Sequence, residues 1–202
     1  MFSEINHSQP DDRLEISPSM KSNDEFVDQQ PNTGDVPANK QSLTVIKIGG
    51  STLGSHDTTL MDLVELQKKG EKFVVIHGGG KTISEWMEKQ GIRPKFVNGL
   101  RVTDSQSLDI VVAVLTGVIN KSIVASINSL GGRAIGISGA DGNMVSAEIA
   151  DPELGYVGKI KSVDTAPIEA ILEAGYIPVI APVGIHSDSD DHSKLLNINA
   201  DT

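Results

Sequence analysis

Three consecutive glycines, residues 78–80, follow an apolar stretch of strand character, and Lys81 comes directly after them. Apolar residues then recur at helical spacing until Gly91, which predicts a strand, a glycine turn and a helix. Glycines lack a Cβ and let a ligand approach the backbone, while the first N–H groups of a helix have no partner within it. The segment therefore favours an anion site, although a glycine turn alone also fits a simple tight connection.

The same layout occurs earlier in the chain. Residues 43–48 form a β-branched stretch that contains Lys47 and runs into Gly49 and Gly50. An apolar stripe at helical spacing follows, for which Asp57 is a suitable N-cap. Two successive strand–helix units predict a parallel sheet, in which ligands gather at the carboxyl ends of the strands. Both glycine turns are expected at that edge.

The charge balance makes isolated cations informative. The chain of 202 residues has 27 acidic and 17 basic residues, a net charge of −10, and no basic face suited to nucleic acid. A site for an anionic ligand must then gather local positive charge against this field. Lys47 and Arg101 are the candidates. The chain has no cysteine, which excludes disulfides and thiol nucleophiles and suits a reducing compartment.

Further elements complete an α/β pattern. Residues 92–104 look too broken for a regular element, and Asp104 is predicted to cap a long core helix that Gly117 bends and that ends at residues 131–132. Strands are expected at 133–138 and 176–181, a helix after Pro167, and a loop at 182–184. Residues 144–150 and 156–163 predict an antiparallel hairpin. The expected fold is a mostly parallel sheet sandwiched by helices, with this hairpin appended.

The two ends of the chain look different from its middle. Residues 1–42 hold eight acidic and three basic residues with few apolar ones, and we expect a disordered acidic leader, with a partner-binding arm as the alternative. The last residues look like an unpaired strand with a polar tip and no closing helix. We therefore expect the chain to be part of a longer protein. No signal peptide, transit peptide or apolar stretch of about 20 residues is recognised, which predicts a cytoplasmic protein.

Residues 186–192 contain two histidines and three aspartates and suggest a metal site. Their spacing matches no familiar ligand pattern, and a solvated hairpin loop is the favoured interpretation.

Six motifs in order carry a resemblance to a known family. They lie at residues 47–51 (KIGGS), 77–80 (HGGG), 96–104 (FVNGLRVTD), 154–158 (LGYVG), 175–179 (GYIPV) and 197–201 (NINAD). From about Val45 to the end, the chain resembles the amino-acid kinase family, most closely its N-acetylglutamate kinase branch. The resemblance implies ATP-dependent phosphorylation of the side-chain carboxylate of N-acetyl-L-glutamate, the second step of arginine biosynthesis. It also implies a homodimer or larger homo-oligomer for the full-length protein.

The resemblance assigns residues to the phosphoryl side of such a site. Lys47 matches the lysine that neutralises charge on the transferring group, and Asp201 matches the aspartate that orients the lysines. The amides of Gly49 and Gly50 match those that face the nucleotide phosphates. Magnesium would be carried mainly by oxygens of ATP and by water, so no metal ligands are assigned to the protein.

The acceptor side is assigned in the same way. Gly79 and Gly80 match backbone donors around the substrate, and Arg101 matches the arginine that binds its α-carboxylate. Asn197 matches the side chain that holds its amide end. An arginine fork suits a carboxylate, and a lysine point charge suits a phosphoryl group.

The match also has departures. The family's nucleotide-binding half would follow Thr202, and Lys81 stands where the family often has proline. Two alternatives remain open. One is a related kinase that acts on an aminoadipate or glutamate group held by a carrier protein, although Val102 favours the acetylglutamate branch over this alternative. The other is a catalytically incomplete fragment that binds N-acetylglutamate.

Overall fold

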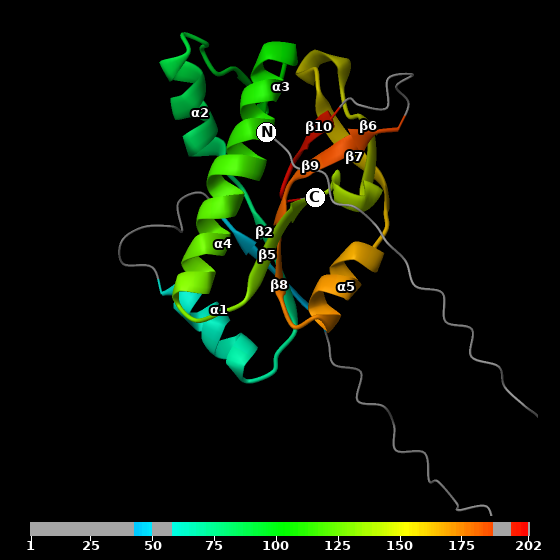
Figure 1. Cartoon of the computed structure of the whole chain (residues 1–202). Coiled ribbons are helices and arrows are strands. Elements are labelled where there is room, and N and C mark those ends of the chain that lie inside the picture. Colours follow the sequence, from blue (N-terminus) through cyan, green and yellow to red (C-terminus); the bar gives the residue numbers. More distant parts are fainter. Residues whose placement is uncertain (1–42, 50–57, 188–194, 202) are drawn as a thin grey trace, which may run out of the picture. The chain divides into compact units, whose positions relative to one another are not determined.

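A parallel four-stranded sheet forms the centre of the structure (Figure 1). The computed structural model describes residues 43–49, 58–187 and 195–201, all within one compact unit. The strands of the four-stranded sheet lie in the order β1-β2-β8-β5. Their bounds are Thr44–Ile48 for β1, Phe73–His77 for β2, Ile177–Ala181 for β8 and Ala134–Ser138 for β5. Ile48 is paired with His77, so β1 and β2 end at the same level, where the two glycine turns begin.

Helices cover both faces of this sheet. One face carries α1 (Thr59–Lys68), α2 (Gly80–Lys89) and the long helix at 105–129, and the other carries α5 (Ala166–Glu173) (Figure 1). Two hydrophobic cores result, because neighbouring side chains of a strand point to opposite faces of the sheet. Val75 packs into the core that includes the long helix, and its neighbour Val74 packs into the core that includes Leu172 of α5. The predicted fold class is confirmed.

The long helix departs from the expected simple bend. It consists of α3 (Ser105–Val112), a π-helical stretch η1 (Ala113–Ile119) and α4 (Asn120–Ser129). Asp104 caps it as predicted, since its Oδ1 accepts a hydrogen bond of 2.8 Å from the amide of Ser107. Gly117 lies within the π-helical stretch, so the predicted irregularity is a widened turn.

The same helix is strongly apolar. Its 25 residues have a mean hydropathy of 2.0 over their most apolar window, so length and composition alone would allow it to cross a membrane. The expectation that no apolar stretch reaches this length is therefore wrong. In the structure, Val111, Val114 and Ile127 are fully buried in the core against the sheet. The packing is that of a core helix.

The predicted hairpin is present, and it belongs to a second sheet. Strands β6 (Val145–Ile149) and β7 (Val157–Val163) pair antiparallel, and with β9 (Val183–His186) and β10 (Leu195–Ile198) they close a small barrel. The expected loop at 182–184 is thus largely a strand. The final strand β10 pairs on both sides, antiparallel with β9 and parallel with β7, so the expectation of an unpaired last strand is wrong.

Two further differences concern short segments. Residues 92–104 are not entirely irregular, because β3 (Phe96–Val97) and β4 (Leu100–Arg101) form a hairpin. Its turn residues Asn98 and Gly99 both have positive φ, as an Asn-Gly hairpin turn requires. The predicted cap Asp57 lies outside the described residues, and Thr58 occupies the N-cap of α1. The leader at 1–42 and residues 188–192 of the suggested metal segment 186–192 fall outside the described ranges, whereas His186 of that segment lies at the end of β9.

Candidate active site

A cavity of about 270 Å³ opens at the carboxyl ends of β1 and β2. Its wall is formed by the glycine turn before α2, the hairpin β3–β4, the long helix and the segment that follows β10. The sites predicted from the sequence meet here. Those that line the cavity are Lys47, Gly49, Gly79, Gly80, Arg101, Asn197 and Asp201. Gly50 lies outside the described residues.

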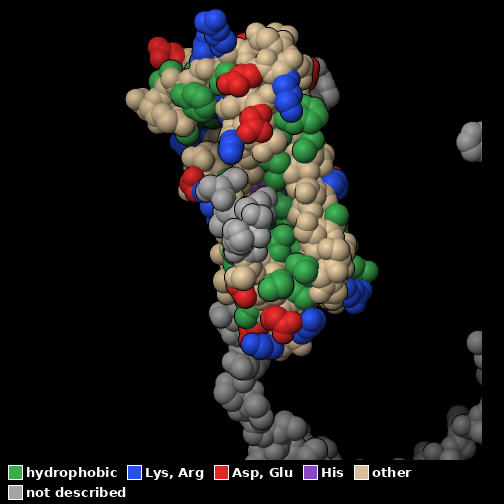
Figure 2. Space-filling model, turned by 90° about the vertical axis from the view of Figure 1, so that its left-hand side faces the viewer, with side chains coloured by type: hydrophobic (Ala, Val, Ile, Leu, Met, Phe, Trp, Pro, Cys, Tyr) green, Lys and Arg blue, Asp and Glu red, His purple; other side chains and the backbone are tan. Residues whose placement is uncertain are grey.

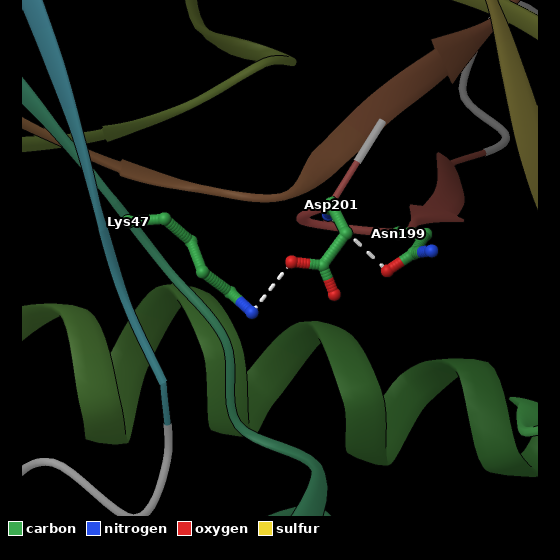
Figure 3. A network of polar contacts seen from close by, with 3 residues as sticks. All are labelled: Lys47, Asn199 and Asp201. Carbon is green, nitrogen blue, oxygen red and sulfur yellow. Dashed lines mark hydrogen bonds and ion pairs between the residues drawn. The ribbon is translucent and has the colours of Figure 1, made fainter.

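Lys47 and Asp201 face each other across one side of the cavity. The Nζ of Lys47 lies 2.6 Å from Oδ1 of Asp201, and the amide of Asp201 donates to Oδ1 of Asn199 at 3.3 Å (Figure 3). Lys47 projects from β1, and Asp201 follows β10, more than 150 residues later. Both side chains are well exposed, so the pair adds little stability and leaves the ammonium accessible to an anion.

The glycine turn is pressed against the long helix. A Cβ on Gly79 would lie 2.5 Å from Cδ1 of Ile119 and 2.8 Å from Cδ2 of Leu115, both of which are buried and belong to the π-helical stretch. Gly79 is the N-cap of α2, and its carbonyl accepts from the amide of Ile83 at 3.0 Å. The absence of a side chain lets the turn lie flat on the core, and the first amides of α2 are left for an anion.

Arg101 is the buried cation of the site. The residue is only 7% exposed, and its Nη2 donates to the carbonyl of Gly80 at 2.7 Å and to Oγ of Ser84 at 2.9 Å. Its Nη1 lies 3.2 Å from Sδ of Met87, and the guanidinium lies over the ring of Phe96, 4.7 Å from its centroid.

No carboxylate within the described ranges forms an ion pair with Arg101. Loss of hydration on burial lowers the pKa of its guanidinium from the ordinary value. A buried cation without a counter-ion gains most from an anionic ligand. The sequence did not reveal the supporting partners, although Ser84 lies one helical turn after Gly80 and Met87 a further turn along the same face.

Asn197 approaches the cavity from β10. Its Nδ2 donates to Oγ1 of Thr103 at 3.3 Å, and its amide nitrogen donates to the carbonyl of Tyr156 at 2.9 Å. These contacts tie β10 to the segment just after Arg101 and to the residue that precedes β7. The sequence offers no signal for a pairing between residues that lie 94 positions apart.

A buried polar network holds the strand ends behind the glycine turn. Nδ1 of His77 lies 3.0 Å from the carbonyl of Gly78, and Nε2 lies 3.3 Å from Nδ2 of Asn120. Nδ2 of Asn120 also donates to the carbonyl of Val179 at 2.9 Å. The carbonyl of Gly78 only accepts, so Nδ1 of His77 carries the proton and Nε2 accepts from Asn120. The network thus requires a neutral imidazole.

This network predicts that the free energy of unfolding decreases as the pH falls below 6.5. Burial lowers the pKa of His77 in the folded chain below its ordinary value of 6.5, so the unfolded chain binds the proton first. The contribution of neutral His77 to the free energy of unfolding is complete above pH 6.5. It is lost as the pH falls below this value, with a slope of at most about 1.4 kcal/mol per pH unit.

Urea unfolding at pH values of about 5.5 and 7.5 measures this change. The variant His77→Gln supplies the background from all other groups and is expected to show the smaller change between the two pH values. An equal decrease in the free energy of unfolding between the two pH values in wild type and in His77→Gln would contradict the prediction.

The comparisons with known proteins agree with this architecture. A model of the amino acid kinase family matches residues 42–202. An acetylglutamate kinase of Dehalococcoides mccartyi is 45% identical over 161 residues, which cover 79% of this chain and 59% of the relative. An acetylglutamate kinase of Caldanaerobacter subterraneus subsp. tengcongensis is 48% identical over 163 residues, covering 78% and 53%. The chain therefore spans between one half and three fifths of the length of these relatives.

Solved structures show the same fold. The protein smu.665 from Streptococcus mutans UA159 superposes with a TM-score of 0.71 at 31% identity, covering 79% of this chain and 64% of that one. N-acetylglutamate synthase from Neisseria gonorrhoeae, complexed with coenzyme A and N-acetyl-glutamate, gives a TM-score of 0.62 at 26% identity, covering 79% and 37%. Because the family model covers most of the sequence and the fold agrees with it, this chain belongs to the amino acid kinase family.

Proposed function

We propose that this chain is the substrate-binding part of an acetylglutamate kinase. The whole protein would transfer a phosphoryl group from ATP to the side-chain carboxylate of N-acetyl-L-glutamate, giving N-acetyl-L-glutamyl 5-phosphate for arginine biosynthesis in the cytoplasm. The relatives at 45% and 48% identity support the assignment. The observation that carries it is the buried Arg101, which lacks a counter-ion among the described residues and lines the same cavity as Lys47 and Asn197.

The acceptor would lie between Arg101 and Asn197. The guanidinium of Arg101 is held in place by Ser84 and the carbonyl of Gly80 and would bind the α-carboxylate. Asn197 would meet the acetylated nitrogen, and the amides of Gly79 and Gly80 would surround the carboxylate that is phosphorylated. Fixed donors of this kind orient a ligand without reorganising when it binds.

The nucleotide phosphates would approach from the side of Lys47. The amides of Gly49 and Gly50 would face them, and Asp201 would keep the ammonium of Lys47 in place through the contact of 2.6 Å. Asp201 is the one carboxylate among the described lining residues, and it is engaged with Lys47. Magnesium would therefore be held by oxygens of the nucleotide and by water, where it neutralises phosphate charge.

The residues present suit a reaction that depends on positioning. A side-chain carboxylate is ionised at neutral pH, so the acceptor needs no general base. Two anions must instead be brought together, and phosphoryl transfer spreads negative charge over three equatorial oxygens. Lys47 and the helix N-terminus at Gly80 supply positive potential where that charge develops.

Association of the whole protein into a homodimer or larger homo-oligomer is part of the same proposal. Apolar side chains remain exposed on the long helix, among them Val118, which is 40% exposed. Figure 2 shows apolar side chains on the face that it presents, with charged side chains gathered mainly toward the two ends of that face. Such a surface supports self-association.

A calorimetric titration tests the acceptor assignment. We expect the 202-residue chain to bind one molecule of N-acetyl-L-glutamate and to bind unacetylated L-glutamate at least about 10-fold more weakly, because the ammonium group places a further positive charge in a cavity already lined by Arg101 and Lys47. Circular dichroism confirms that the chain is folded. A folded chain that binds neither compound, or that prefers glutamate, would contradict the proposal.

A further inference from the structure

Thr103 lies behind the two side chains that would hold the acceptor. It is fully buried between β4 and the N-cap of the long helix. Its Oγ1 lies 3.2 Å from the carbonyl oxygen of Arg101 and 3.3 Å from Nδ2 of Asn197. One hydroxyl therefore joins the backbone of Arg101 to the side chain of Asn197.

The chemistry of these partners fixes the direction of both hydrogen bonds. A backbone carbonyl only accepts, so the hydroxyl of Thr103 must use its single proton toward Arg101. Only lone pairs of Oγ1 then remain for Asn197, which must turn its NH₂ group toward Thr103. The Oδ1 of Asn197 is consequently directed away from Thr103, in a side chain that lines the cavity.

The backbone around this hydroxyl is itself fixed. The amide of Thr103 donates to the carbonyl of Leu154 at 2.8 Å, and its carbonyl accepts from the amide of Tyr156 at 2.7 Å. The carbonyl of Tyr156 in turn accepts from the amide of Asn197 at 2.9 Å. The backbones of Thr103 and Asn197 are thus held relative to each other, and with the two side chains in contact the open question is which of oxygen and nitrogen in the Asn197 amide faces Thr103.

We propose that Thr103 is a positioning residue that sets the amide orientation of Asn197, so that Oδ1 of Asn197 accepts a hydrogen bond from the amide N–H of the acetylated acceptor. This inference rests on the proposed function and adds the element that selects an N-acyl group by its N–H. An acceptor atom in this position favours a ligand that carries a proton there. A ligand with oxygen in the same place would turn lone pairs toward Oδ1 and leave it unsatisfied.

The test compares the binding of two ligands to three proteins, the wild type, Thr103→Val and Thr103→Ser. One ligand is N-acetyl-L-glutamate, and the other is its ester analogue, O-acetyl-(S)-2-hydroxyglutarate, in which oxygen replaces the N–H. We expect the wild-type chain to prefer the amide by at least about 10-fold, as for a site built around one hydrogen bond. In Thr103→Val, which keeps the shape and loses the hydroxyl, the preference should fall to about 3-fold or less, since the amide of Asn197 can then turn over. Thr103→Ser should restore it.

A matched control separates this role from general damage. Thr116 also has a hydroxyl that bonds to a backbone carbonyl, that of Val112 at 2.8 Å, and Thr116 does not line the cavity described above. Thr116→Val should leave the ratio of the two affinities unchanged. A merely structural role of Thr103 would weaken both ligands together and would not change their ratio.

The outcomes distinguish this inference from the proposed function. If the folded wild-type chain binds neither ligand, the proposed function is contradicted, and the inference is overturned with it. If wild type binds N-acetyl-L-glutamate but accepts the ester equally, or if Thr103→Val keeps the full preference, only the role of Thr103 is overturned. If Thr103→Val does not fold, exchange of the Asn197 side-chain protons in ligand-free wild type decides by NMR. One slowly exchanging NH₂ proton is expected, and rapid exchange of both would overturn the inference.

Discussion

Replacing Arg101 by alanine is expected to weaken binding of N-acetyl-L-glutamate by at least about 30-fold. Arg101 is 7% exposed and has no counter-ion in the described part of the chain, so part of the cost of its burial would be recovered only when an anion binds. Loss of one partner of a buried charge pair typically costs about 2–5 kcal/mol, which corresponds to this change in affinity or more. Calorimetric titration of the variant against N-acetyl-L-glutamate measures it.

The affinity of Arg101→Lys for N-acetyl-L-glutamate is expected to fall between those of the wild type and of Arg101→Ala. The ammonium keeps the charge, but it cannot reproduce the planar guanidinium that bonds Gly80 and Ser84 and that, in the proposed function, would also bind a carboxylate. This intermediate result would show that geometry as well as charge contributes to binding.

Arg133→Ala is the matched control for the loss of charge. Arg133 also lies over an aromatic ring, that of Tyr176 at 4.2 Å, and does not line the cavity. Its removal changes the net charge of the chain by the same amount and should leave the affinity within about 2-fold of wild type. An Arg101→Ala chain that folds normally and binds within about 3-fold of wild type would exclude Arg101 as the carboxylate ligand.

The sequence predicted the elements whose signals are local. The apolar stretches of β1 and β2, the glycines that follow them, and the cap at Asp104 each act within a few residues, and the structure has them as expected. For the π-helical stretch around Gly117, the sequence predicts only a bend. Leu115 and Ile119 of this stretch lie against Gly79, and the sequence periodicity contains no signal for that contact.

The second sheet shows where local signals mislead. Pro182 and Gly184 are turn formers, so the sequence predicts a loop at residues 182–184. Pairing with β10 and with β6 overrides this preference and makes β9 a strand of the barrel.

The candidate site follows the same division between local and distant contacts. Its residue types could be named from motifs, and most of them line one cavity. The partners that hold these residues in place could not be named from motifs, because a contact such as that between Asn197 and Thr103 joins distant parts of the chain.

Gly155→Ala is expected to lower the free energy of unfolding by about 3 kcal/mol or more, the largest effect on stability that we predict. Gly155 has a φ of +69°, which disfavours any residue with a side chain. An added Cβ would also overlap the carbonyl oxygen of Thr103. That oxygen accepts the bond from Tyr156 and cannot move away without breaking the link between the segment after Arg101 and β7.

Gly91→Ala isolates the contribution of the backbone angle. Gly91 has a comparable φ of +77°, and an added Cβ would meet nothing within 4 Å, so only the conformational cost of about 1–2 kcal/mol applies. Urea unfolding of both variants and the wild type gives the two differences directly. Equal destabilisation would mean that the loop at Gly155 relaxes freely and that Thr103 is not held by it. A larger loss for Gly155→Ala, together with weaker binding of N-acetyl-L-glutamate by the chains that remain folded, would tie the stability of this contact to the orientation of Asn197 in the site.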